Sequence, residues 1–350
     1  MSEFSPFSQD PEVLASMPLT ADLVEHSAEE EKKAPLEKYL NSEIVSKLTN
    51  LFDELAKKYE DMSYDSTDGL DFADELSTRA EEIFASQKNE VSESVKFSFG
   101  KMGEVLEEDL AFSLDEERAS GGFVSEKEEK ILEWFDNNSQ KEMLHDMVKW
   151  QQEAMKMTQW LSMLEGGDVL INQFYERWRQ FAGKRLGAEG AESIVRGITG
   201  PLLFSKLCDE AGYDVFLPDV VWDRDEKIDF LIKDKSSQDM VYATQMKSKK
   251  AGNLGVRIEG SNDQSDLQGK ALKEKESLEK SVGKFDRIWS GKYGIRMKPL
   301  FVTVDGLIES QYDLGTGEMV DKKLKSQLIE NIKQSLANQI GSEEQLAQAA

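Results

Sequence analysis

Proline is absent from residues 36–200, and this long interval constrains the fold more than any other feature of the sequence. Proline breaks helices and glycine weakens them, and no glycine occurs before Gly69. Apolar residues recur in steps of three and four, most clearly at Leu36, Leu40, Ile44, Leu48, Leu51 and Leu55. The spacing predicts a helical region over residues 36–182.

Two capping boxes predict where helices of this region begin. Ser125 is followed by Glu128, and Ser139 is followed by Glu142. Behind the second box, apolar residues alternate in steps of four and three: Met143, Met147, Trp150, Ala154, Met157, Leu161 and Leu164. This spacing is typical of a coiled-coil seam, either inside the chain or in a homodimer. A flexible ligand groove lined by methionine is the alternative.

Charge is distributed unevenly along the chain. Residues 1–150 hold 15 basic and 37 acidic side chains, a net charge of −22, whereas the rest of the chain carries −3 out of a total of −25. A strongly acidic chain counts against nucleic-acid binding, and this objection is weaker for the second half because the acidic residues are concentrated in the first. Residues 1–35 contain Pro6, Pro11 and Pro18 without any periodicity, which predicts a disordered acidic tail.

Several classes of protein are disfavoured by composition. One cysteine and two histidines argue against a zinc site and against Cys/His or Ser/His nucleophilic catalysis. No stretch approaches the roughly 18 apolar residues of a membrane span, so no membrane partner is expected. The first ten residues lack the pattern of a signal peptide, and a cytoplasmic location is the expectation.

The sequence changes in character after Pro201, where strand-forming residues become frequent. The pattern predicts a helix over 202–211, strands over 213–222, 227–232 and 240–247, a loop over 252–263, a helix over 267–285 and a strand over 297–304. This order predicts an α/β domain with a mixed sheet over residues 187–305. A further helix and tail occupy 306–350. The fold class expected for the whole chain is α+β.

Three polar residues stand out on two of these strands. Side chains alternate between the faces of a strand, so Asp229 is expected opposite Ile228 and Phe230. Gln245 and Lys247 are two residues apart and share one face of the next strand. A charged group among apolar strand residues is costly unless it is paired or binds a metal.

The three side chains suit metal-dependent hydrolysis of a phosphodiester. Mg²⁺ prefers oxygen ligands, which the Asp229 carboxylate, the Gln245 side chain and the backbone carbonyl of Met246 could supply; Mn²⁺ is the alternative. Lys247 would place a positive charge where the phosphate gains negative charge. In the competing interpretation, Asp229 and Lys247 form an ordinary salt bridge on a solvated strand.

The run Lys227-Ile228-Asp229-Phe230-Leu231-Ile232, followed by Ala243-Thr244-Gln245-Met246-Lys247, resembles the PD-(D/E)XK nuclease superfamily, and its glutamine is most similar to the Mrr-type branch. The resemblance implies a restriction-endonuclease-like core of the order αβββαβ. It also implies that Asp229 and Gln245 bind the metal and that Lys247 is the catalytic cation. The family often adds a glutamate from its first helix, for which Glu189, Glu192 and Glu210 compete and Glu192 is favoured.

Double-stranded DNA is the expected partner, and basic residues beyond the motif are candidates for contacts with it: Lys249, Lys250, Arg257, Lys270 and Lys273. Glutamates 274, 276 and 279 are interleaved with the lysines of the helix, so a salt-bridged surface is the alternative there. The leading hypothesis is a DNA endonuclease. The others are an inactive nuclease-like fold that binds nucleic acid or protein, and a helical scaffold that binds basic partners.

Overall fold

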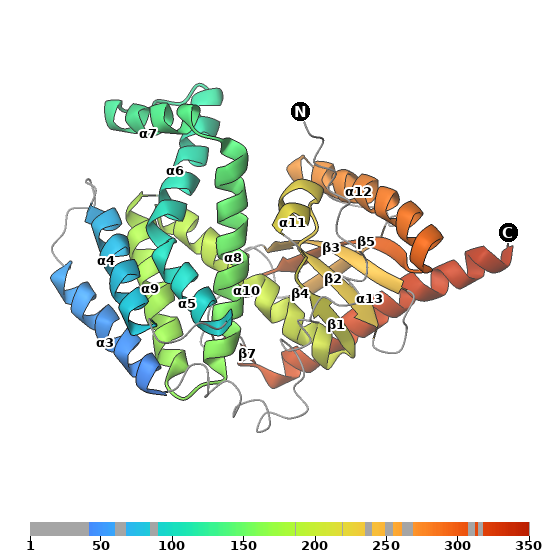
Figure 1. Ribbon diagram of the computed structural model, residues 1–350. Coiled ribbons are helices and arrows are strands. Elements are labelled where there is room, and N and C mark those ends of the chain that lie inside the picture. Colours follow the sequence, from blue (N-terminus) through green and yellow to red (C-terminus); the bar gives the residue numbers. More distant parts are fainter. Residues whose placement is uncertain are drawn as a thin grey trace. The chain divides into compact units, whose positions relative to one another are not determined.

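The computed structural model describes residues 42–59, 68–84, 90–185, 187–218, 220–234, 240–248, 255–260, 269–306, 312–313 and 318–349, and the tail expected over 1–35 lies outside them. The described chain divides into two compact units (Figure 1). A helical unit comprises residues up to 203 and the hairpin around 312–320. An α/β unit comprises residues 204–306 and 321–349.

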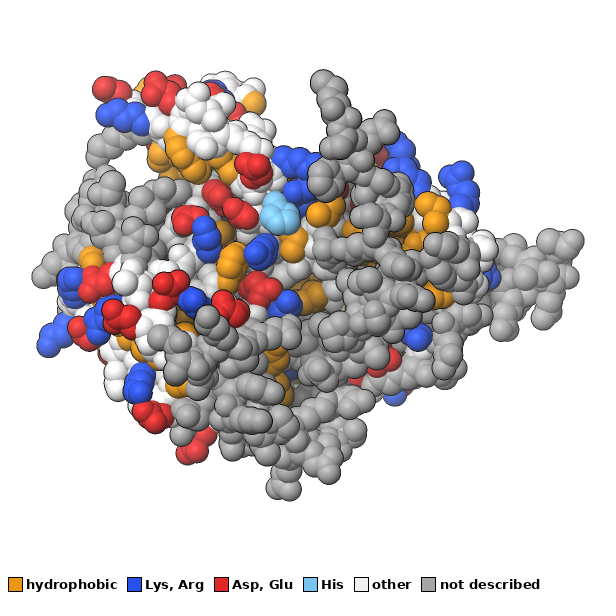
Figure 2. Space-filling view, in the orientation of Figure 1, with side chains coloured by type: hydrophobic (Ala, Val, Ile, Leu, Met, Phe, Trp, Pro, Cys, Tyr) orange, Lys and Arg blue, Asp and Glu red, His pale blue; other side chains and the backbone are white. Residues whose placement is uncertain are grey.

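The helical unit contains α3 (Ser42–Lys58), α4 (Asp68–Ile83), α5 (Glu90–Gly100), α6 (Met102–Ala119), α7 (Glu126–Asn137), α8 (Gln140–Ser162), α9 (Gly167–Arg185), the start of α10 (Gly187–Glu210), and the strand pair β6 (Tyr312–Asp313) and β7 (Glu318–Met319). The described part of 36–182 is therefore helical, as the proline-free interval predicts. Acidic and basic side chains are interspersed over its face in Figure 2.

Helix starts in this unit follow the predicted capping boxes. Ser125 caps α7 by accepting from the Glu128 amide, and the Glu128 side chain accepts from the Ser125 amide at 2.7 Å. Ser139 caps α8 through the first of these two hydrogen bonds, in which its side chain accepts from the Glu142 amide. After α8 the chain turns through Gly167, where a Cβ would lie 1.9 Å from the Leu161 carbonyl oxygen, so that only glycine fits.

The stripe on α8 is buried at six of its seven positions, and Met147 is half-buried. Beside it lies an aromatic core: the Trp150 and Trp178 rings have centroids 4.5 Å apart, and those of Phe99 and Phe174 are 5.1 Å apart. The Trp150 indole N–H donates to the Ser98 carbonyl at 2.8 Å. The stripe therefore serves packing, and a solvent-open methionine groove does not form there.

The α/β unit contains the end of α10, then β1 (Tyr213–Phe216), α11 (Val220–Glu226), β2 (Phe230–Asp234), β3 (Met240–Ser248), β4 (Gly255–Glu259), α12 (Lys270–Tyr293), β5 (Arg296–Asp305) and α13 (Lys322–Ala349). The strands form one mixed sheet in the order β1-β2-β3-β5-β4. Strands β3 and β5 are parallel and are joined through α12, while the other pairs are antiparallel. The fold is α+β with a five-stranded mixed sheet.

Helices cover both faces of this sheet (Figure 1). On one face, Trp222 of α11 stacks on Phe285 of α12 with centroids 4.6 Å apart, and Trp289 joins them in the core. Both tryptophans are buried, so they serve packing rather than base stacking. On the other face, Phe204 of α10 meets Phe230 of β2.

Several local predictions are wrong in detail. The strand expected over 213–222 ends at Phe216. Residues 220–226 form the helix α11 instead, because Trp222 packs in the core beneath α12. The loop expected over 252–263 contains the edge strand β4. The helix expected over 202–211 is the end of a longer helix, α10, which begins at Gly187 and continues through Pro201. The burial of Ile198 and Leu202 offsets the cost of about 3 kcal/mol that proline imposes inside a helix.

Among the described residues, no helix is long and apolar enough to cross a membrane.

Candidate functional site

Asp229 immediately precedes β2 and directly follows a strained turn. Lys227 adopts a left-handed backbone with φ of 60°, which is uncommon for a residue other than glycine. The Lys227 ammonium donates to the Arg224 carbonyl at 2.8 Å, and the Ile228 amide donates to the Trp222 carbonyl at 3.3 Å. These contacts tie the turn to the end of α11 and aim Asp229 at β3.

This turn also corrects the predicted alternation of side chains. Ile228 packs with Leu231 and Ala243 in the core under α12, whereas Phe230 packs on the other face. Ile228 therefore does not share a face with Phe230, because regular strand geometry begins only at Phe230. The pairing of Phe230 with Thr244 still places Asp229 across from Gln245, as parity predicts.

The Asp229 carboxylate is held by β3 through three hydrogen bonds. The Gln245 side-chain amide donates to its two oxygens at 3.0 and 2.9 Å, and the Met246 backbone amide donates to Oδ2 at 2.7 Å. The Asp229 amide donates in turn to the Thr244 carbonyl at 2.8 Å. Carboxylate and carboxamide are thus fixed relative to one another by the backbone of two paired strands.

Gln245 is 4% exposed, and its Oε1 atom has no hydrogen-bond partner among the described residues. A buried carbonyl oxygen left without a donor costs about 1–3 kcal/mol. This oxygen lies on the same carboxamide that contacts Asp229. An additional cation or donor bound here would satisfy it.

Lys247 is paired with a residue that the sequence did not single out for chemistry. Its ammonium lies 2.9 Å from Glu274 Oε2 on α12. The Lys247 side chain is 35% exposed and that of Glu274 is 16% exposed. The next residue, Lys275, is buried in an ion pair with Glu259 of β4 at 3.4 Å, which anchors the start of α12 on the sheet.

Burial, followed by nearby negative charge, determines the electrostatics around Asp229. Burial raises the pKa of the Asp229 carboxyl well above its usual range, and the nearby carboxylates of Asp223 and Glu274 raise it further. The Met246 amide and the Lys247 ammonium lower the same pKa. A positive charge added beside Asp229 would stabilise its ionised form.

The remaining sequence-predicted residues are Glu192 and the basic residues expected to contact DNA. Glu192 belongs to the helical unit and pairs with Arg179 at 3.1 Å. Arg257 is exposed on β4 and pairs with Asp305 at 2.9 Å, and Lys273 is exposed on α12. Lys249 and Lys250 lie outside the described residues, as does the side chain of Lys270.

Glu274 and Asp223 are the site residues that the sequence reasoning missed. In the sequence, Glu274 is one of several glutamates interleaved with the lysines of its helix, and Asp223 lies between the two strands expected over 213–222 and 227–232. One signal could have indicated Glu274, namely its position near the start of α12. This end of the helix lies beside the end of β3 that carries Lys247.

The donor set fits a hard cation with few protein ligands. Among the described residues there is no group of three or more His, Cys, Asp or Glu side chains that could hold a metal. Nε2 of Gln245 faces the Asp229 carboxylate, and a flip of this carboxamide would turn its oxygen, Oε1, toward Asp229. Mg²⁺ commonly takes one or two carboxylates and fills its remaining positions with water and substrate. Comparisons with protein-family models, curated proteins and solved structures find no match to this chain.

Proposed function

We propose that the α/β unit is a metal-dependent nuclease that hydrolyses phosphodiester bonds in DNA. The observation that carries the proposal is the contact between Asp229 and Gln245, because it joins a carboxylate with a raised pKa to a carboxamide whose buried oxygen has no donor within the described part of the chain. A cation bound to Asp229, with the carboxamide flipped so that Oε1 faces it, would satisfy both groups. The order of elements α10, β1, β2, β3, α12, β5, with α11 and β4 added, supports the resemblance to the PD-(D/E)XK superfamily.

Asp229 and the Oε1 atom of Gln245 would hold Mg²⁺ or Mn²⁺. The Met246 carbonyl is a third candidate, because the N–H and C=O groups of one strand residue face the same neighbour and the Met246 N–H already faces Asp229. When bound, such an ion lowers the pKa of a water and neutralises charge on the phosphate.

Lys247 stabilises the negative charge that accumulates on the phosphate as the bond to the attacking oxygen forms. Glu274 positions the Lys247 ammonium through the ion pair between them. Lys273 and Arg257 are proposed to contact the DNA backbone. The helical unit is proposed to serve partner or target selection, in a monomer or a homodimer.

The test is cleavage of supercoiled plasmid DNA by the full chain with Mg²⁺ or Mn²⁺. We expect metal-dependent nicking that is lost in Asp229→Asn and retained in Asp225→Asn, an exposed carboxylate on neighbouring α11. Nicking that persists in Asp229→Asn would reject the site.

A second candidate function is a nuclease-like fold that binds nucleic acid or protein without cleaving it. The lack of a third metal-binding side chain among the described residues favours this alternative. DNA binding without cleavage under any divalent metal would establish it over the enzyme.

A further inference from the structure

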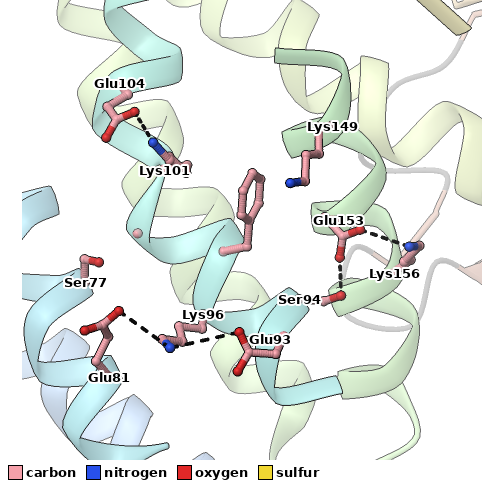
Figure 3. A pocket seen from close by; sticks show the side chains of 12 residues that line it. Ser77, Glu81, Glu93, Ser94, Lys96, Lys101, Glu104, Lys149, Glu153 and Lys156 are labelled. Carbon is pink, nitrogen blue, oxygen red and sulfur yellow. Dashed lines mark hydrogen bonds and ion pairs between the residues drawn. The ribbon is translucent and has the colours of Figure 1, made fainter. Parts of the chain in front are cut away.

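Two groups of charged side chains in this chain differ in how their charges are arranged. A cavity of about 590 Å³ in the helical unit, between α4, α5, α6 and α8, is lined by four lysines and four glutamates (Figure 3). Lys96 lies 3.5 Å from Glu81. Lys156 lies 2.9 Å from Glu153. Opposite charges are paired in this cavity, whereas the nearest strong charge acting on Asp229 is of like sign.

That like charge is the carboxylate of Asp223, which is half-buried on α11. The carbonyl of the preceding residue, Trp222, accepts from the Ile228 amide at 3.3 Å. Ile228 directly precedes Asp229, so this hydrogen bond fixes the backbone of Asp223 beside that of Asp229. The left-handed turn at Lys227 closes the loop between them. The fold therefore brings two carboxylates to one place through the backbone.

This proximity has an electrostatic cost. Burial is the main cause that raises the pKa of the Asp229 carboxyl, and the negative charge of Asp223 is the next. The effect of Asp223 is larger than the opposing effect of the Lys247 ammonium. Two like charges held together are costly unless they share a proton or bind one cation. The pair therefore favours an occupant that both carboxylates contact.

Gln245 determines which of these two occupants fits. Its Oε1 atom is buried without a partner among the described residues. A proton shared by the carboxylates leaves this oxygen unsatisfied, whereas a divalent cation takes oxygen ligands from carboxylates and carboxamides alike. A flip of the carboxamide would present Oε1 instead of Nε2 to the cation at Asp229. Mg²⁺ commonly takes one or two carboxylates, and Asp223 supplies the second.

We propose that Asp223 is the second carboxylate ligand of the divalent cation that Asp229 binds. This inference rests on the proposed function, because it adds a ligand to the same metal site. It places a metal ligand on α11, outside the two sequence runs that resemble the nuclease motif. Two carboxylates and one carboxamide also agree with the finding that no three His, Cys, Asp or Glu side chains form a metal-binding group among the described residues.

The test compares the Mg²⁺ requirement of variants of the full chain. Thermal melts without DNA measure Mg²⁺ binding, and plasmid nicking measures the Mg²⁺ concentration for half-maximal activity. Outer-sphere partners of a metal contribute about 10–100-fold in affinity, so Asp223→Asn should raise both Mg²⁺ concentrations about tenfold or more. Asp223→Glu keeps the carboxylate and should lose less. Asp225→Asn, an exposed carboxylate on the same helix, is the matched control and should behave as the parent does.

Melting temperatures without metal separate a metal ligand from a residue that only supports the fold. Asp223→Asn removes a like charge beside Asp229, so without Mg²⁺ its melting temperature should equal or exceed that of the parent. Its stabilisation by Mg²⁺ should be reduced. A melting temperature lowered by the same amount with and without Mg²⁺ would overturn the inference. If Asp223→Asn does not fold, Asp223→Ser carries the same comparison.

The outcomes distinguish this inference from the proposed function. Only the role of Asp223 is overturned if the parent nicks DNA with Mg²⁺ and Asp229→Asn does not, while Asp223→Asn needs no more Mg²⁺ than Asp225→Asn. If the parent neither binds nor uses Mg²⁺ or Mn²⁺, the proposed function fails and the role of Asp223 fails with it.

Discussion

The carboxamide of Gln245 donates to both oxygens of the Asp229 carboxylate, at 3.0 and 2.9 Å, and its own oxygen is buried without a partner among the described residues. The contact joins the first residue before β2 to the middle of β3. The Met246 amide stabilises the ionised Asp229 carboxylate, whereas two nearby carboxylates oppose it. The proposed cation site rests on this arrangement.

Replacing Gln245 by glutamate places a second carboxylate against Asp229. Without metal, two acids at about 3 Å repel one another, and we expect Gln245→Glu to lower the free energy of unfolding by about 1–3 kcal/mol. Saturating Mg²⁺ should restore stability, because an added ligand charge tightens binding and a ligand at 100 times its dissociation constant contributes about 2.7 kcal/mol.

Thermal melts with and without Mg²⁺ measure this effect. Gln327→Glu, an exposed position on α13, is the control and should show no dependence on the metal. Equal responses of the two variants would contradict a metal site at Asp229.

Lys247→Ala should lower the rate of DNA cleavage more than it lowers DNA affinity, because the ammonium acts on charge that develops during the reaction. Removal of one such electrostatic contact typically costs about 10²–10³ in rate. Glu274→Gln should cost less, since it removes only the partner that positions Lys247. Single-turnover cleavage and filter binding separate the two quantities.

Lys280→Ala on the exposed side of α12 serves as the matched control for Lys247→Ala. A loss of affinity without a loss of rate would place Lys247 in DNA binding alone.

Glu108 of α6 links stability to pH. It is buried, its Oε2 has no partner among the described residues, and burial raises its pKa to about 8, with Asp146 and Glu104 adding to the shift. The folded chain therefore binds a proton that the unfolded chain releases near the ordinary pKa of 4.5. The contribution of Glu108 to the free energy of unfolding is fully present below about pH 4.5. It is lost progressively as the pH rises to about 8.

Glu108→Gln, a neutral side chain of the same shape, should flatten this pH dependence. The change that Glu108→Gln makes in the free energy of unfolding should be more favourable at pH 9 than at pH 5, by about 1–3 kcal/mol. Urea denaturation across this range tests the prediction, with the exposed Glu116→Gln of the same helix as control. Parallel pH profiles for the parent and Glu108→Gln would disprove it.

The two methionines of the α8 stripe should respond differently to charge. Met157 is fully buried, so Met157→Lys should cost about 3 kcal/mol or more, because the ammonium has no partner there. Met147 is half-buried, and its lysine can extend to water, so Met147→Lys should cost about 1 kcal/mol or less. Chemical denaturation measures both; equal losses would contradict the burial of the stripe.

The sequence alone determined the features that depend on neighbours along the chain. Helix periodicity, the capping boxes at Ser125 and Ser139, and the pairing of Asp229 with Gln245 follow from periods of 3.6 and 2 residues and from local hydrogen bonds. Only the tertiary structure decided that α11 forms where a strand was expected, that Ile228 turns toward α12, and that Glu274 reaches Lys247 from 27 residues further along the chain. These contacts depend on where the crossover helix docks on the sheet, and docking depends on the burial of Trp222 and Phe285, which have no fixed spacing in sequence.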